Sequence, residues 1–122
     1  MLSLIFAFLE HGLTRLGIDV EFINMADLEE VKAKIRDNTR IVYLETPANP
    51  NMDICDIEAI SKIAHEKEGR MVIVDNTYCT PYIQKPLSLG ADLVVHSATS
   101  SADPTTNPAI TSPCPFRYLV AE

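Results

Sequence analysis

The chain has 122 residues, which fits one small domain with a single hydrophobic core. Its 17 acidic and 10 basic side chains give a formal net charge of -7 with no block of like charge, so we expect no nucleic-acid partner. Cys55, Cys79 and Cys114 are odd in number, far apart and without a CxxC pair. This pattern favours a reducing compartment over a disulfide scaffold or a metal site.

The first residues are apolar for too short a stretch before Glu10 to cross a bilayer, and they lack the basic start of a signal peptide. Leucines at helical spacing predict a helix over residues 3–16 that packs inward and ends at Gly17. We therefore expect no membrane partner and, by default, a cytoplasmic location.

Strand and helix patterns alternate along the rest of the first hundred residues. Strands are predicted at 18–24, 40–46, 70–76 and 91–97, and further helices at 27–38 and 56–67. This order implies right-handed crossovers and a largely parallel sheet covered on both faces, which is a three-layer α/β fold. Ligands of such sheets bind outside the carboxyl ends of the strands, here residues 46–49, 75–77 and 96–99.

The composition and the periodicity of the sequence change at Ser100. The remaining residues hold four of the eight prolines and show almost no helical or strand period, so they cannot bury enough apolar surface to offset their chain entropy. We expect one partial domain over residues 1–99 and a divergent, disordered tail over residues 100–122.

Four polar residues at the expected strand ends have both an ordinary and a functional interpretation. Asp75 is either a turn former or a buried carboxylate that awaits a cationic ring nitrogen. Asn49 is either a loop amide or a donor to a ligand oxygen. Ser97 and Thr99 are either solvated hydroxyls or a phosphate cradle. Tyr78 and Tyr82 are interpreted as packing residues, and no dinucleotide, Walker, HExxH or GxSxG motif is present.

Three segments together resemble the pyridoxal-phosphate-dependent enzymes of cysteine and methionine metabolism. They are "FLEHGLTRLGIDVEFIN", "ETPANPNMDICDI" and "VIVDNTYCTPYIQKPLSLGADLVVHSAT", and the resemblance runs from about Ala7 to Thr99. It implies part of the large domain of an aspartate-aminotransferase-like fold. It also implies pyridoxal 5'-phosphate as cofactor and a sulfur-containing amino acid as substrate of a carbon–sulfur lyase.

The resemblance assigns a role to each matching position. Asp75 would pair with the pyridine nitrogen and keep it protonated, so that the ring accepts electrons from the substrate. Asn49 would bond the phenolic oxygen of the ring, and Ser97 and Thr99 would hold the phosphate. The position after Thr99 is a lysine in this family, and here it is Ser100. A serine hydroxyl cannot replace the covalent bond to the cofactor or the base that this lysine supplies.

The first interpretation is therefore a truncated relative that binds the cofactor weakly and without a covalent bond, and that has no catalytic residue and no expected turnover. A second is a non-catalytic protein that associates with full-length family subunits through apolar faces exposed by truncation. A third, in which Lys85 replaces the missing base, is the weakest.

Overall fold

The structure is a computed structural model, and it describes residues 7–47 and 52–96. Its centre is a sheet of three parallel strands in the order β1 (Ile41–Glu45), β2 (Met71–Asp75) and β3 (Leu93–Val95). Glu45 pairs with Asp75, and Asp75 pairs with Val95. The three carboxyl ends therefore lie side by side at one edge, as the sequence predicts.

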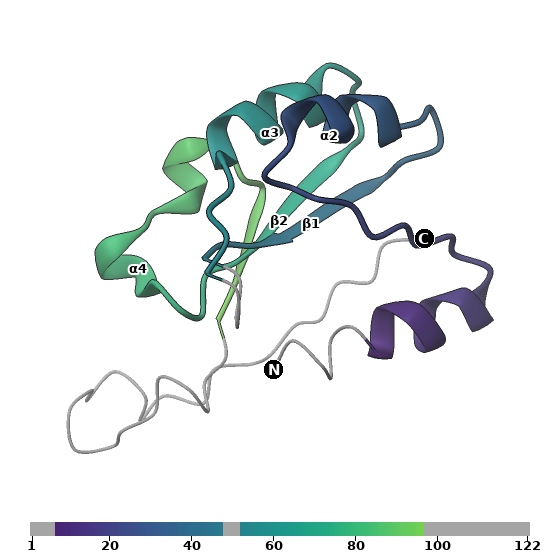
Figure 1. Ribbon diagram of the computed structural model, residues 1–122, viewed down its shortest axis with the longest axis horizontal. Coiled ribbons are helices and arrows are strands. Elements are labelled where there is room, and N and C mark those ends of the chain that lie inside the picture. Colours follow the sequence, from purple (N-terminus) through teal and green to yellow (C-terminus); the bar gives the residue numbers. More distant parts are fainter. Residues whose placement is uncertain (1–6, 48–51, 97–122) are drawn as a thin grey trace.

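Two helices lie over one face of the sheet (Figure 1). They are α2 (Leu28–Lys34) and α3 (Ile57–His65). Each begins at an aspartate whose carboxylate accepts hydrogen bonds from main-chain N–H groups of the first turn, Asp27 from Glu29 and Glu30 and Asp56 from Ala59. Such caps satisfy donors that the helix itself leaves unpaired, which fixes where both helices start.

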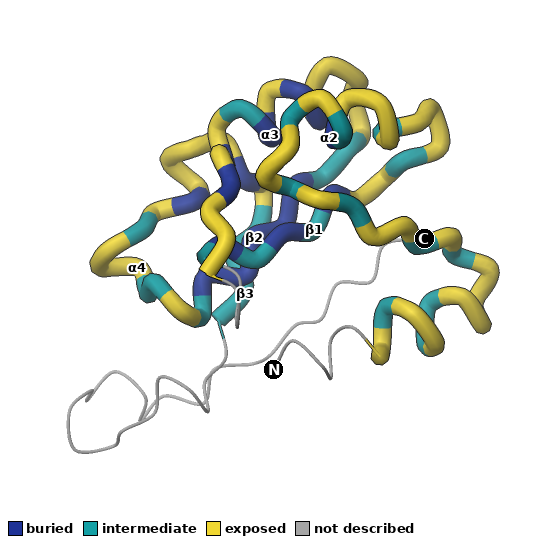
Figure 2. The backbone as a smooth tube through the Cα atoms, viewed as in Figure 1, coloured by how far each residue is buried: buried dark blue, intermediate teal, exposed yellow. Residues whose placement is uncertain are grey.

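The core fills the space between these helices and the sheet (Figure 2). Val42 and Leu44 of β1 are buried there with Ile60 of α3, which has no exposed surface. Because successive side chains of a strand point to opposite faces, the alternate positions lie on the other side of the sheet. Asp75 is one of these. The described residues thus form two of the three expected layers, and the α/β prediction with a parallel sheet is confirmed.

The segment between β2 and β3 contains two short helices that the sequence pattern does not predict. They are α4 (Thr80–Ile83) and the 3-10 helix η3 (Pro86–Leu89). Pro81 and Pro86 stand in their first turns, where a missing N–H costs nothing. The packing interpretation of Tyr78 and Tyr82 is wrong, because these side chains are 54% and 93% exposed.

The first described segment differs from the prediction in two ways. It forms a π-helix, η1 (Phe8–Leu13), and a 3-10 helix, η2 (Thr14–Leu16), and it ends at Gly17 as expected, with a φ of 78°. None of its residues is buried, so inward packing is wrong: Figure 1 shows this segment apart from α2 and α3. The strand predicted at 18–24 is also wrong. No described strand pairs with it, and a strand needs a partner for its ladder.

No helix in the described ranges is long and apolar enough to cross a membrane.

Candidate functional site

Asp75 lies at the carboxyl end of the central strand and is only 2% exposed. Its two oxygens have different partners. The hydroxyl of Tyr43 donates to Oδ2 at 3.1 Å, while Thr77 donates to Oδ1 from its main-chain N–H at 3.0 Å and from its hydroxyl at 2.6 Å. A carboxylate with these donors is held in one orientation. The turn-forming interpretation of Asp75 is therefore correct, and it coexists with a buried, fixed acid at the strand end.

A second carboxylate, Glu45, lies on the neighbouring strand at the position that pairs with Asp75. Burial and the nearby charge of Asp75 raise the pKa of Glu45 above its ordinary value. Burial and the same aspartate also raise the pKa of Tyr43, so that its hydroxyl remains a neutral donor. Within the described residues no ion pair includes Asp75 or Glu45. This edge of the sheet consequently favours a cation.

The acceptor atoms of Asp75 fit the N–H group of a protonated pyridine ring. A carboxylate has about four acceptor positions. The described contacts of Asp75 use three of them, two on Oδ1 and one on Oδ2. One position on Oδ2 is left for a further donor, and a cationic N–H would form a charge-assisted hydrogen bond there.

The turn after β2 is fixed by a buried amide network. Asn76 has no exposed surface, and its side chain exchanges hydrogen bonds with Gln84: Asn76 Nδ2 donates to the Gln84 carbonyl oxygen and Gln84 Nε2 donates to Asn76 Oδ1, both at 2.9 Å. Gln84 Nε2 also donates to the carbonyl oxygen of Thr46 at 3.0 Å. These bonds join the ends of β1 and β2, so the chain that follows each strand leaves the edge in a defined direction.

The other predicted site residues, Asn49, Ser97 and Thr99, lie outside the described residues, as does Ser100. The structure therefore places one of the four predicted cofactor residues, Asp75, and describes the strands that lead toward the other three.

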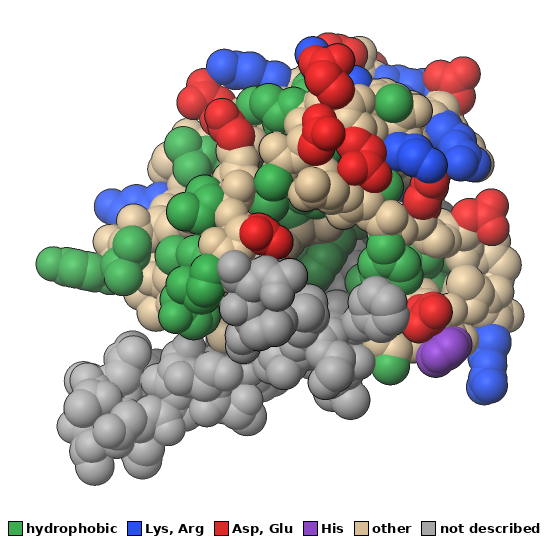
Figure 3. Space-filling model, viewed as in Figure 1, with side chains coloured by type: hydrophobic (Ala, Val, Ile, Leu, Met, Phe, Trp, Pro, Cys, Tyr) green, Lys and Arg blue, Asp and Glu red, His purple; other side chains and the backbone are tan. Residues whose placement is uncertain are grey.

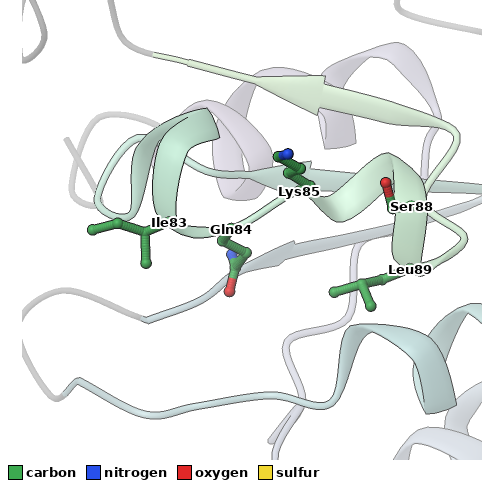
Figure 4. Close-up of a pocket in the computed structure, with 5 residues that line it drawn as sticks. All are labelled: Ile83, Gln84, Lys85, Ser88 and Leu89. Atoms are coloured by element: carbon green, nitrogen blue, oxygen red, sulfur yellow. The ribbon is translucent and has the colours of Figure 1, made fainter.

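A shallow pocket of about 420 Å³ is lined by residues of the segment 83–89, namely Ile83, Gln84, Lys85, Ser88 and Leu89. Figure 4 shows Lys85 and Ser88 pointing to one side and Gln84 and Leu89 to the other. Side chains that diverge in this way do not enclose a small molecule.

Cysteine chemistry and metal binding have little support among the described residues. Cys55 and Cys79 are free thiols, and burial raises the pKa of Cys55. A thiol that resists ionisation is a poor nucleophile and a poor metal ligand. In the same residues no group of three His, Cys, Asp or Glu side chains could hold a metal ion.

Sequence reasoning missed Tyr43, Glu45 and Thr77. Two signals were available. Tyr43 and Glu45 are two residues apart in a strand and so share a face, and Thr77 follows Asp75 at the spacing of an Asx turn. The pairing of Glu45 with Asp75 depends on the register of the parallel strands, which the sequence does not reveal.

Proteins with an open parallel α/β sheet bind their ligands outside the carboxyl ends of the strands, where Asp75 lies. The family model for Cys/Met metabolism PLP-dependent enzymes matches residues 4–101. The chain belongs to this family. Its fold is that of these pyridoxal-phosphate-dependent enzymes, and a structure described as metB from Corynebacterium glutamicum agrees: the TM-score is 0.74 at 40% identity, over 77% of this chain and 24% of that one.

Within the family, the chain is similar to L-methionine gamma-lyases. It is 63% identical to that of Fusobacterium nucleatum and 64% identical to that of Porphyromonas gingivalis, each over 94 residues that make up 77% of this chain and 24% of the relative. It is 52% identical over 87 residues to a cystathionine gamma-lyase of Bacillus subtilis, at 71% of this chain and 23% of that protein. The chain thus spans about a quarter of the length of these relatives.

Proposed function

We propose that this chain is part of the cofactor-binding domain of a carbon–sulfur lyase of the methionine gamma-lyase type. In this proposal residues 1–99 bind pyridoxal phosphate weakly and without a covalent bond, and residues 100–122 are a divergent tail. The acidic edge formed by the buried Asp75 and the half-buried Glu45 is the single observation that carries the cofactor assignment. The free thiols are the support for a cytoplasmic location.

Each proposed residue has a distinct task. Asp75 keeps a proton on the ring nitrogen, Asn49 donates to the phenolic oxygen, and Ser97 and Thr99 hold the phosphate. When bound, the cofactor supplies an electron sink for bond cleavage at a sulfur-containing amino acid. Ser100 stands where the family has its lysine. Its hydroxyl forms no covalent bond with the cofactor and moves no proton at neutral pH, so the chain by itself has no lyase turnover.

The test compares the wild-type chain with Ser100→Lys. Both are incubated with pyridoxal phosphate and reduced with borohydride, and the adduct is located by peptide mass mapping, since surface lysines also react. We expect an adduct at position 100 only in the lysine variant. An adduct on Lys85 would support the replacement base. Release of methanethiol from methionine by the wild-type chain at an enzyme-like rate would overturn the proposal.

Non-covalent binding is tested separately by equilibrium dialysis. Asp75→Asn should weaken cofactor binding about tenfold or more, because it removes a charge-assisted hydrogen bond. Asp53→Asn is the matched control, since Asp53 is an exposed carboxylate. Equal affinities of the two variants would show that Asp75 does not contribute to cofactor binding.

A second candidate function is association with full-length family subunits, and the surface around α4 favours it. Hydrophobic side chains gather on the α4 side of the molecule (Figure 3). Tyr82, Ile83 and Leu87 are 93%, 75% and 61% exposed. Exposed apolar side chains grouped in this way are typical of surfaces that a partner covers.

Sedimentation of the chain mixed with a full-length L-methionine gamma-lyase tests this association. Ile83→Asp should abolish a mixed complex that wild type forms. Ile54→Asp, at a position that is 76% exposed but lies outside the segment around α4, should leave the complex intact. A wild-type chain that sediments as a monomer beside the longer enzyme would contradict association.

A further inference from the structure

Tyr43 has a position that suits it to act on Asp75 across the sheet. It lies on β1 two residues before Glu45, the strand partner of Asp75, and therefore shares the face that carries Asp75. Its hydroxyl reaches Asp75 Oδ2 at 3.1 Å. The contact joins two strands whose residues are far apart in sequence, so it forms only when the sheet is in register.

The other oxygen of Asp75 is fixed from its own strand end. Thr77 donates twice to Oδ1, at 3.0 Å and 2.6 Å. Two donors at one oxygen anchor that oxygen but allow the carboxylate to swing about it. The bond from Tyr43 to Oδ2 removes this remaining freedom, and it leaves one acceptor position on Oδ2.

We infer that Tyr43 is a positioning residue for the cofactor site: its hydroxyl aims Oδ2 of Asp75 at the ring nitrogen of pyridoxal phosphate. This inference rests on the proposed function. Tyr43 itself does not touch the ring in this arrangement. It acts through Asp75, and the orientation of that carboxylate determines how firmly the ring nitrogen keeps its proton.

Two effects of removing the hydroxyl oppose each other. Asp75 would lose a neutral donor, and this loss makes the carboxylate a stronger acceptor. It would also lose its alignment with a cationic N–H, and such a charge-assisted hydrogen bond is roughly twice as strong as a neutral one. The second effect is larger, so the proton on the ring nitrogen should be held less firmly.

The experiment follows the proton directly. The full 122-residue chain is saturated with pyridoxal phosphate labelled with nitrogen-15 in the ring, and the chemical shift of that nitrogen is measured against pH. We expect Tyr43→Phe to lower the pH at which the bound ring nitrogen loses its proton by about one unit, which corresponds to about 1.4 kcal/mol. Tyr82→Phe is the control, because that tyrosine is 93% exposed.

The possible outcomes separate this inference from the function on which it rests. If wild type shows only free cofactor, the proposed function fails and the inference fails with it. If wild type binds a protonated ring and Tyr43→Phe leaves its midpoint unchanged or raises it, the inference alone is overturned. Should the phenylalanine variant not fold, fluorotyrosine placed at position 43 by nonsense suppression changes the donor strength and keeps the ring. A midpoint that does not respond to fluorination would then overturn the inference.

Discussion

Asn76 and Gln84 exchange hydrogen bonds in both directions across the turn that follows β2, each at 2.9 Å. Because Asn76 is fully buried, its amide cannot exchange these partners for water. The pair therefore holds the edge of the sheet where Asp75 lies.

Asn76→Ala should lower the free energy of unfolding by about 1–3 kcal/mol, because it removes both hydrogen bonds between the fully buried Asn76 amide and the part-buried Gln84. Urea denaturation followed by circular dichroism measures this. Asn38→Ala, in an exposed turn, serves as the control and should change little. Equal losses in the two variants would show that the network contributes nothing beyond an ordinary surface amide.

Asp75→Asn should lower the pKa of Glu45. Burial and the charge of Asp75 both raise this pKa above the ordinary value of 4.5, and the variant removes only the charge. The pKa should therefore fall and still remain above 4.5. Carbon-13 NMR of the Glu45 carboxyl carbon measures the midpoint, with Asp53→Asn as the control. No change in Asp75→Asn would mean that burial alone sets the pKa.

The same carboxyl gives a pH dependence of stability with a definite sign. A glutamate whose folded-state pKa is raised binds its proton more tightly in the folded chain than in the unfolded chain. Its ionisation therefore costs stability as pH rises from the ordinary value to the raised one. Glu45→Gln should abolish this decrease in urea midpoints measured across that range. A decrease that persists in the variant would assign it to another group.

Asp92 should produce the opposite dependence. Its burial alone would raise its pKa, but hydrogen bonds from the Val72 N–H and from His65 outweigh burial and lower the pKa below 3.8. The stabilisation is present above 3.8 and is lost as pH falls through the folded-state pKa. Asp92→Asn should abolish this decrease of the urea midpoint at low pH, whereas Asp19→Asn, at an exposed position, should retain the decrease.

Gly90→Ala should destabilise the chain more than Gly17→Ala. Both glycines have positive φ angles, 100° and 78°, so an alanine at either costs about 1–2 kcal/mol in backbone strain. A Cβ at Gly90 would also lie 3.0 Å from Ser61 Cβ, while a Cβ at Gly17 meets nothing within 4 Å. Thermal unfolding of the two variants measures the difference, and equal losses would show that α3 gives way to the added methyl group.

The sequence predicts best where one local rule dominates. Apolar runs locate β1, β2 and β3 to within two residues, and capping aspartates mark the starts of α2 and α3. Residues 18–24 alternate like a strand but have no described partner, and short segments such as α4 depend on tertiary packing.

The residues of the candidate site likewise divide into those set by a local pattern and those set by tertiary packing. Asp75 is visible from sequence because a polar residue ends an apolar strand and because the surrounding motif resembles the family's. Tyr43 is not visible, because its role depends on which residue of a neighbouring strand lies opposite. The register is decided by packing of the whole layer, which a local pattern does not encode.

The parallel order of the strands has a kinetic consequence. Tyr43 and Asp75 meet only after the chain between them has closed a long crossover, unlike the adjacent strands of a hairpin. Non-local pairings of this kind slow folding, since the entropy of loop closure is lost before any contact repays it. Asp75 therefore reaches its final position late in folding. The cofactor can bind at this edge only after the sheet has formed.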